Sequence, residues 1–185
     1  MRIIAGKWRG RRLLPLKGER IRPTTDKVKE AMFSILGPQI SGATVLDLCC
    51  GTGGLGLEAL SRGAQRVYFV DDSHRSLTQV RRNLDLFGAL DGEAVLCKAE
   101  AVTWFLEWAE PPAGGNWLLV SDPPYSTDVA GEILVQLVDR AVNEGFLGAI
   151  VEHDRHDQPV VARENGPRIE CRHYGGCGLT IVRPD

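Results

Sequence analysis

Hydrophobic residues along this chain alternate between two patterns. Short continuous apolar runs, typical of strands buried on both faces, are followed by segments in which apolar residues recur every three or four positions, as in amphipathic helices. The predicted strands are residues 45–48, 66–70, 94–98, 117–120 and 149–151. The predicted helices are residues 28–36, 55–60, 77–87, 101–108 and 129–142. This alternation predicts an α/β fold with a doubly wound, mostly parallel sheet, closed by two further strands near Ile169 and at 179–182.

The first residues follow a different pattern. Two short apolar runs, 2–6 and 12–16, are separated by the basic segment Lys7-Trp8-Arg9-Gly10-Arg11, which predicts a small β-hairpin with basic groups at its turn. Trp8 either stacks on a nucleic-acid base or anchors the hairpin, and the sequence leaves both open. Residues 22–26, Arg-Pro-Thr-Thr-Asp, carry helix-capping chemistry, and Gly37-Pro38 ends that helix. We therefore divide the chain into an N-terminal extension, 1–22, and a main domain, 23–185.

The central stretch of the chain is residues 45–56, Val-Leu-Asp-Leu-Cys-Cys-Gly-Thr-Gly-Gly-Leu-Gly. It predicts a buried strand, a tight glycine-rich loop and the start of a helix. Glycine lets the backbone approach a ligand closely and turn where a Cβ would clash. Asp47 falls at the carboxyl end of the strand, where open α/β sheets bind their ligands.

Two ligands compete for such a loop. Gly51 to Gly56 matches the dinucleotide pattern G-x-G-x-x-G, and Asp71 follows at the spacing of a ribose-binding acid. A pyrophosphate, however, seeks the positive end of a helix dipole, and the Asp47 carboxylate would repel it. S-adenosylmethionine carries a cationic amino-acid end that a carboxylate attracts. The D-x-x-x-G-x-G spacing therefore favours the methyl donor over a nicotinamide.

Composition limits the remaining function classes. The chain has 185 residues, 43% of them hydrophobic, which suits one well-buried domain. No apolar run approaches the ~20 residues that span a bilayer, and residues 2–12 are too basic for a signal peptide, so we expect a cytoplasmic protein. The five cysteines are odd in number and contain no C-x-x-C pair, which favours reduced, structural thiols over a metal site.

Charge is distributed unevenly. Residues 1–30 carry ten basic and three acidic side chains, a net charge of +7, whereas residues 31–185 carry −9. A cationic end on an acidic body predicts a polyanionic partner, and a solvated basic surface is the alternative. The candidate RNA-binding residues are Arg2, Lys7, Trp8, Arg9, Arg11, Arg12 and Arg22.

The predicted strand 117–120 runs into Ser121-Asp122-Pro123-Pro124-Tyr125. An exocyclic amine on a nucleobase is a poor nucleophile, because its lone pair is delocalised into the ring. A carboxylate and a backbone carbonyl can accept hydrogen bonds from the two N–H groups of the amine, and these bonds draw the nitrogen toward sp³ character. The two prolines stiffen the loop and remove competing N–H donors, so the Pro123 carbonyl can accept a hydrogen bond from the amine. Tyr125 can stack on the base. Asp122 to Tyr125 thus predict amine methylation.

These motifs resemble a known family. The D-P-P-Y tetrapeptide is shared by amino-methyltransferases that act on adenine N6, cytosine N4 or guanine N2. The opening Arg2-Ile3-Ile4-Ala5-Gly6, the segment 22–30 and the segment 56–64 look like the bacterial 16S ribosomal RNA guanine-N2 methyltransferases. The family more often has an aromatic residue and alanine in place of Cys49-Cys50, and usually glutamate in place of Asp71.

The resemblance implies a class I, Rossmann-like fold with a seven-stranded sheet, and S-adenosylmethionine as the cofactor. It implies that Asp47, Gly51 and Gly53 line the cofactor loop and that Asp71 holds the ribose hydroxyls. Glu100 and Ala101 would meet the adenine, and residues 122–125 the target guanine. The implied partner is 16S ribosomal RNA in the small ribosomal subunit, with no membrane association and a monomeric enzyme.

Three rivals stay open. An adenine-N6 methyltransferase on DNA or RNA uses the same tetrapeptide, and a non-catalytic RNA-binding or assembly factor could share the fold. A nicotinamide oxidoreductase has no need of D-P-P-Y. His153 and His156 lie three apart with no third ligand indicated, so we predict a surface loop there and no metal. Glu152, Arg81 and Arg82 are predicted to be solvated or structural.

Overall fold

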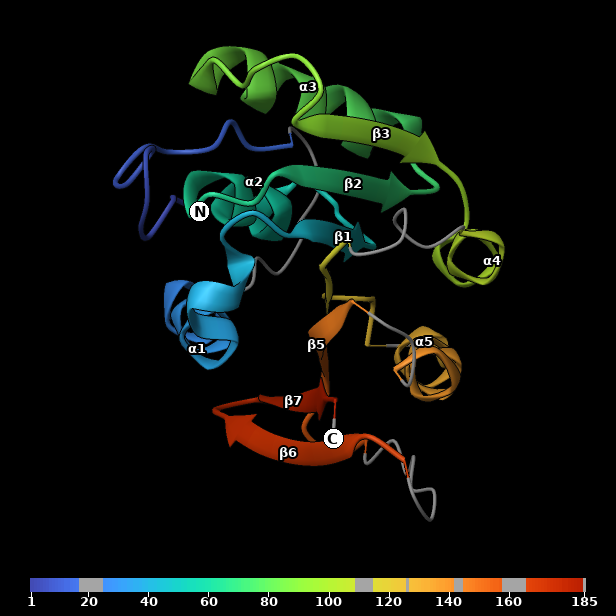
Figure 1. Cartoon of the computed structure of the whole chain (residues 1–185). Helices are drawn as coiled ribbons and strands as arrows, with labels where there is room; N and C mark the ends of the chain where they lie inside the picture. Colours follow the sequence, from blue (N-terminus) through green and yellow to red (C-terminus); the bar gives the residue numbers. More distant parts are fainter. Residues whose placement is uncertain (17–24, 109–114, 126, 142–144, 158–165, 185) are drawn as a thin grey trace.

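The computed structural model describes residues 1–16, 25–108, 115–125, 127–141, 145–157 and 166–184. Its centre is a seven-stranded sheet in the order β3-β2-β1-β4-β5-β7-β6 (Figure 1). The strands are β1 Thr44–Leu48, β2 Arg66–Asp71, β3 Ala94–Lys98, β4 Trp117–Ser121, β5 Phe146–Asp154, β6 Arg168–Tyr174 and β7 Cys177–Arg183. The chain order reverses between β1 and β4, and ligands bind outside the carboxyl ends of strands at such a point.

The predicted sheet is confirmed. β3, β2, β1, β4 and β5 are parallel to one another, and the predicted closing pair is an antiparallel hairpin of β6 and β7. β7 pairs with β5, also antiparallel. Within the register, Leu48 of β1 lies opposite Val70 of β2 and Ser121 of β4. The residues that follow these three strands therefore meet at one edge of the sheet.

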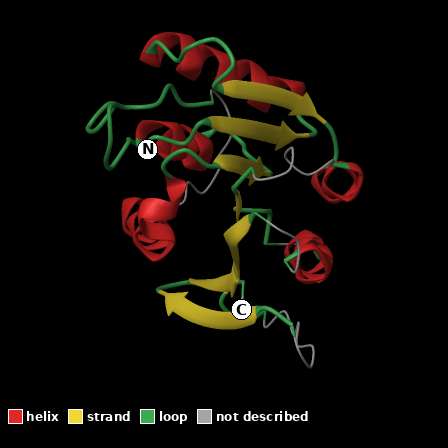
Figure 2. Cartoon of the chain, viewed as in Figure 1, coloured by secondary structure: helices red, strands yellow, loops and turns green. Residues whose placement is uncertain are grey.

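Helices cover both faces of the sheet (Figure 2). Buried residues of α1, α2 and α3 share one hydrophobic cluster, and those of α4 and α5 share the other. Strand β1 divides its side chains between the two clusters, Val45 to the first and Leu46 and Leu48 to the second. The helices are α1 Asp26–Leu36, α2 Gly54–Ser61, α3 His74–Phe87, α4 Ala101–Glu107 and α5 Val129–Arg140, with a 3₁₀ helix η1 at Gly37–Ile40. No helix in the described ranges has both the length and the apolar character needed to cross a membrane.

The N-terminal segment forms the predicted hairpin only in part. Its two arms are antiparallel and joined by backbone hydrogen bonds, from the Ile3 N–H to the Arg11 carbonyl at 2.9 Å and from the Leu13 N–H to the Met1 carbonyl at 3.2 Å. The pairing is limited to one bridge, Arg2 with Arg12, and neither arm is a regular strand. The residues between them also bond to α2: Gly6 packs against the Ser61 carbonyl, and the backbone N–H of Lys7 donates to that oxygen at 2.7 Å. The boundary drawn at residues 22 and 23 lies outside the described residues.

Trp8 occupies the anchoring position. The residue is 6% exposed, and the centroid of its ring lies 5.4 Å from that of the Phe87 ring of α3. Ile3 and Leu13 join the same hydrophobic cluster as the helices. The apolar side of residues 1–13 is therefore part of the main core, and its basic groups are left on the surface.

A buried ion pair attaches this segment to two helices. Lys29 of α1 and Glu58 of α2 are both fully buried, with Nζ and Oε2 3.4 Å apart. Glu58 also accepts the backbone N–H groups of Ile4 at 2.7 Å and Ala5 at 3.0 Å. Burial lowers the pKa of Lys29, although Glu58 opposes the shift. The Arg62 guanidinium also pairs with Glu58 at 2.8 Å, so it is loss of Glu58 that would leave Lys29 as an uncompensated buried charge and destabilise the segment.

Candidate active site

The loop after β1 is built around two glycines in the left-handed region, Gly51 with φ 53° and Gly53 with φ 80°. Gly53 caps the N-terminus of α2, and its own N–H closes a turn onto the Cys50 carbonyl at 2.8 Å. A Cβ at Gly51 would meet no heavy atom within 4 Å. Cys49 shares the positive φ, at 58°, which a side chain rarely adopts. The loop thus turns sharply at the carboxyl end of β1.

Two acids hold the loop in place. Asp47 is buried, and its Oδ2 accepts the Gly56 N–H at 2.8 Å. Asp71, half-buried at the end of β2, accepts the N–H groups of Gly51 at 2.8 Å and Ser73 at 2.9 Å. Burial raises the pKa of both acids, that of Asp47 to about 8. Both therefore lie beside the glycine loop, as the sequence predicts.

Glu100 and Ala101 lie at the start of α4. Glu100 is the N-cap residue, and its carboxylate accepts the N–H groups of Val102 at 2.9 Å and Thr103 at 2.8 Å. Ala101 is buried and reaches the same cavity as Glu100. The helix start fixes both residues at the cavity wall.

The tetrapeptide Asp122 to Tyr125 follows β4 on the same sheet edge. Pro123 is buried and Pro124 is exposed. The Pro124 carbonyl accepts the Thr127 hydroxyl at 2.8 Å, and the Tyr125 hydroxyl donates to Glu152 Oε1 at 2.5 Å. Burial and this bond to Glu152 raise the pKa of Tyr125. The phenol therefore stays neutral across the physiological range.

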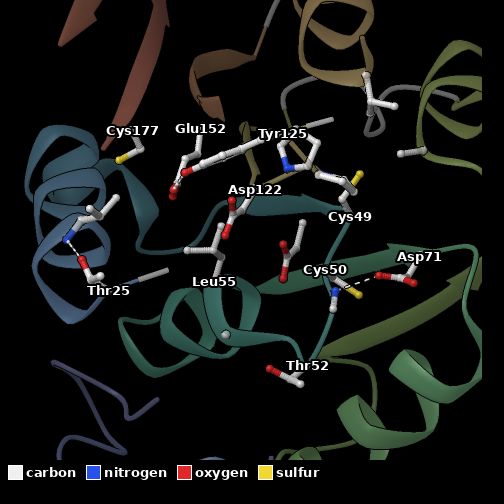
Figure 3. A pocket seen from close by; sticks show the side chains of 18 of the residues that line it. Thr25, Cys49, Cys50, Thr52, Leu55, Asp71, Asp122, Tyr125, Glu152 and Cys177 are labelled. Carbon is white, nitrogen blue, oxygen red and sulfur yellow. Dashed lines mark hydrogen bonds between the residues drawn. The ribbon is translucent and has the colours of Figure 1, made fainter. Parts of the chain in front are cut away.

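A single cavity of about 910 Å³ joins these parts. One end contains Gly51, Asp71, Glu100 and Ala101, and the other contains the tetrapeptide with residues of β5 and the β6–β7 turn. In Figure 3, Asp122, Tyr125, Glu152 and Cys177 gather on one side, and Cys50 and Asp71 lie on the other. Of the predicted cofactor and catalytic residues, only Gly53 does not line the cavity. Gly53 instead shapes the loop, through the turn that its N–H closes onto the Cys50 carbonyl.

Sequence reasoning missed part of the wall. Met1, Lys27 and Cys177 line the cavity, as does Glu152. Glu152 is 4% exposed, so the solvated alternative is wrong and the structural one holds. A signal was available, since an acid at the carboxyl end of an apolar strand is the same pattern that identified Asp47 and Asp122.

The predicted surface loop at residues 153–156 is also wrong in part. His153 belongs to β5 and is 1% exposed, because the strand runs on to Asp154 and pairs with β7. Its Nε2 lies 3.0 Å from the Thr180 hydroxyl. Arg155 and His156 are exposed, in the turn after the strand. In the part of the chain that the structure describes, no three His, Cys, Asp or Glu residues are grouped to hold a metal ion.

The basic residues of the N-terminal segment fall into two groups. Arg2 pairs with Asp26 at 2.8 Å, Lys7 pairs with Glu93 at 2.7 Å, and the Arg11 guanidinium donates to the Phe87 carbonyl at 3.2 Å. Arg9 and Arg12 are exposed and form no salt bridge with a described residue. Arg22 lies outside the described residues.

The residues present fit S-adenosylmethionine. The glycine loop exposes backbone to a cavity of sufficient size, Asp71 offers a carboxylate at the end of β2, and Asp47 faces the cavity with an acid that a cation would ionise. The doubly wound sheet places this cavity at its switch point. Fold and site together define a class I methyltransferase that depends on S-adenosylmethionine.

Comparison with known proteins gives the family. The family model described as "Conserved hypothetical protein 95" matches residues 1–183, so the chain belongs to that family. "Putative rRNA methyltransferase YlbH" of Bacillus subtilis is 37% identical over 188 residues, which cover 99% of this chain and 98% of that protein. "Ribosomal RNA small subunit methyltransferase D" of Haemophilus influenzae is 33% identical over 165 residues, with coverages of 89% and 84%.

A solved structure agrees with this assignment. "Putative methyltransferase yhhF" from Escherichia coli superimposes with a TM-score of 0.78 at 29% identity, over 100% of this chain and 98% of the other. The predicted fold, methyltransferase class and cofactor are therefore confirmed. The nicotinamide alternative is rejected.

Proposed function

We propose that the enzyme transfers a methyl group to the exocyclic N2 amine of a guanine in 16S ribosomal RNA of the small subunit. One observation carries this proposal: Asp122 to Tyr125 open into the same cavity as the glycine loop. An amine-binding tetrapeptide is thereby joined to a methyl-donor site. The names of the relatives point to small-subunit ribosomal RNA as the substrate.

Asp122 is proposed to hold the target amine. Its carboxylate and the Pro123 carbonyl accept hydrogen bonds from the two N–H groups of the amine. The carboxylate also stabilises the positive charge that develops on the nitrogen. S-adenosylmethionine supplies the electrophilic methyl group. Tyr125 provides an aromatic face for the base, which must leave any stack to reach this cavity.

The cofactor roles follow from position along the other half of the cavity. Asp47 attracts the cationic amino-acid end, and the backbone of Gly51, shaped by Gly53, approaches the donor closely. Asp71 binds the ribose hydroxyls and also accepts the hydrogen bond from the Gly51 N–H. Glu100 and Ala101 form the adenine wall at the start of α4.

Residues 1–22 are proposed to dock RNA. Arg2 and Arg12 form a bridge beside Met1, which lines the cavity, so basic groups lie next to the cavity entrance. Arg9 and Arg12 are the strongest candidates for phosphate contacts. Arg2 and Lys7 are weaker candidates because each is paired with an acid, and Arg22 stays a candidate from the sequence alone. Trp8 and Arg11 hold the segment against α3. A ribosomal substrate also implies a cytoplasmic enzyme, which we propose acts as a monomer.

The test is methyl transfer from labelled S-adenosylmethionine to small subunits and to naked 16S RNA from a strain that lacks the enzyme. Digestion to nucleosides, followed by mass spectrometry, should give N2-methylguanosine. N6-methyladenosine would establish the adenine alternative instead. Binding of RNA without any transfer would support the assembly-factor alternative and reject this proposal.

A further inference from the structure

Glu152 belongs to the target half of the cavity although it is distant in sequence from the tetrapeptide. It lies in β5, which pairs with β4 in a register that sets Val151 opposite Ser121. The next residues on the two strands are Glu152 and Asp122, so the two acids are neighbours across the sheet edge. Figure 3 shows Glu152 on the same side of the cavity as Asp122 and Tyr125.

A hydrogen bond joins Glu152 to the tetrapeptide. The Tyr125 hydroxyl donates to Glu152 Oε1 at 2.5 Å. Glu152 is rigidly held, because β5 is paired with β4 on one side and with β7 on the other. Glu152 itself is only 4% exposed. Tyr125, by contrast, belongs to a turn outside any helix or strand. The sheet therefore provides a fixed acceptor for a side chain on an irregular loop.

We propose that Glu152 is a positioning residue that fixes the ring of Tyr125 as the platform for the target base. The inference rests on the proposed function, since it assigns Tyr125 the stacking role. A tyrosine ring on a turn has two rotatable bonds, and an anchored hydroxyl at its far end restricts both. A base stacked on a fixed ring presents its amine to Asp122 at a fixed distance and angle, and methyl transfer depends on such alignment.

Four variants separate this role from other roles of the carboxylate. Tyr125→Phe removes the donor, Glu152→Ala removes the acceptor, Glu152→Gln keeps an acceptor oxygen without the charge, and the fourth variant combines Tyr125→Phe with Glu152→Ala. One charge-assisted hydrogen bond corresponds to roughly a tenfold change in rate. The single-turnover rate at saturating donor should fall about tenfold in Tyr125→Phe and in Glu152→Ala, and no further in the double variant.

Glu152→Gln should recover most of the rate lost in Glu152→Ala. The affinity for S-adenosylmethionine should match wild type in all four variants, and so should that of Glu132→Ala, which removes an exposed acid of α5 as a control. If Glu152→Gln is as slow as Glu152→Ala, the charge acts directly and the positioning role is rejected. Multiplicative losses in the double variant would reject it too.

A second measurement does not depend on turnover. With 3-fluorotyrosine at position 125, the ¹⁹F resonance should shift and narrow when Glu152 becomes alanine, and stay near its original position with glutamine. An unmoved resonance in Glu152→Ala overturns the inference whatever the activity. If wild-type enzyme transfers no methyl group to small-subunit RNA, the proposed function fails on its own while this signal still decides the contact.

Discussion

Asp47 and Gly56 meet where the first residues of α2 pass the end of β1. The Gly56 N–H donates to Asp47 Oδ2 at 2.8 Å, and a Cβ on Gly56 would lie 2.8 Å from that oxygen and 2.3 Å from Phe69 Cε1. Glycine is therefore required for the helix to approach the acid. Burial still raises the pKa of Asp47 to about 8, because one N–H bond does not replace the lost hydration.

Asp47 should make the ligand-free enzyme less stable as pH rises. Its pKa is about 8 in the folded chain against 3.8 unfolded, so between these values the folded state holds a proton that the unfolded state has released. The free energy of unfolding then falls by up to about 1.4 kcal/mol per pH unit. Urea denaturation of wild type and Asp47→Asn across pH 5 to 9 measures the difference. Parallel pH profiles would show that Asp47 is ionised throughout.

The sheet could be predicted from the sequence because its central strands are buried on both faces. Residues 94–98 are predicted at the observed bounds of β3, and the start of β4 at Trp117 is also observed. The acids Asp47, Asp71 and Asp122 were found because each follows such a run. Parallel strands bring their carboxyl ends to one edge, so local patterns were sufficient to assemble most of the site.

Long-range pairing decided what could not be predicted. Glu152 follows an apolar run as Asp122 does, but only the register of β5 against β4 shows that the two acids are neighbours. The N-terminal arms bond to each other in part, as the hairpin pattern predicts, but the N–H groups of residues 4, 5 and 7 bond to Glu58 and Ser61 of α2. These partners are more than 50 positions away, and no local pattern indicates them.

Gly6 should be essential for attaching the N-terminal segment. Its φ is +82°, and a Cβ would lie 1.7 Å from the Ser61 carbonyl oxygen, so Gly6→Ala should cost about 3 kcal/mol or more. Gly10 is the matched control, with φ +81° and no heavy atom within 4 Å of the added carbon. Gly10→Ala should cost only about 1 kcal/mol. Thermal and urea denaturation compare the two, and equal losses would mean that the contact with Ser61 adds nothing.

Asp71 should matter for donor binding. Asp71→Ala removes the acceptor for the ribose hydroxyls and for the Gly51 N–H. The binding free energy of S-adenosylmethionine should weaken by about 1.5–3 kcal/mol, the range for hydrogen bonds to a charged group. Calorimetric titration measures it, with Asp85→Ala as the control on an exposed acid of α3. Affinity equal to wild type would place the ribose elsewhere in the cavity.

Asp122 should act in the chemical step. Positive charge develops on the amine only as the methyl group arrives, so Asp122→Ala should slow single turnover by ~10²-fold or more while donor affinity changes far less. Asp91→Ala, an exposed acid in the turn before β3, should leave both unchanged. A rate for Asp122→Ala within a few-fold of wild type would mean that another group holds the amine.

Arg9 and Arg12 should carry the phosphate contacts of the N-terminal segment. Both are exposed, whereas Arg11 is committed to the Phe87 carbonyl. Each phosphate neutralised contributes about −0.7 to −0.9 to the slope of log affinity against log salt, so replacing both by alanine should flatten the slope by about 1.4–1.8. Binding of small-subunit RNA across a salt series measures this slope.

The matched control replaces two arginines on the far side of the sheet. Arg168 and Arg172 are exposed on β6, at the end of the sheet away from β2 and β3, and removal of both changes the net charge by the same amount. If both pairs flatten the slope equally, the effect comes from overall charge. If neither does, the basic segment is a solvated surface and the RNA contacts lie on another face. A slope that flattens only in the Arg9 and Arg12 variant, with donor affinity intact, identifies the segment as the docking element.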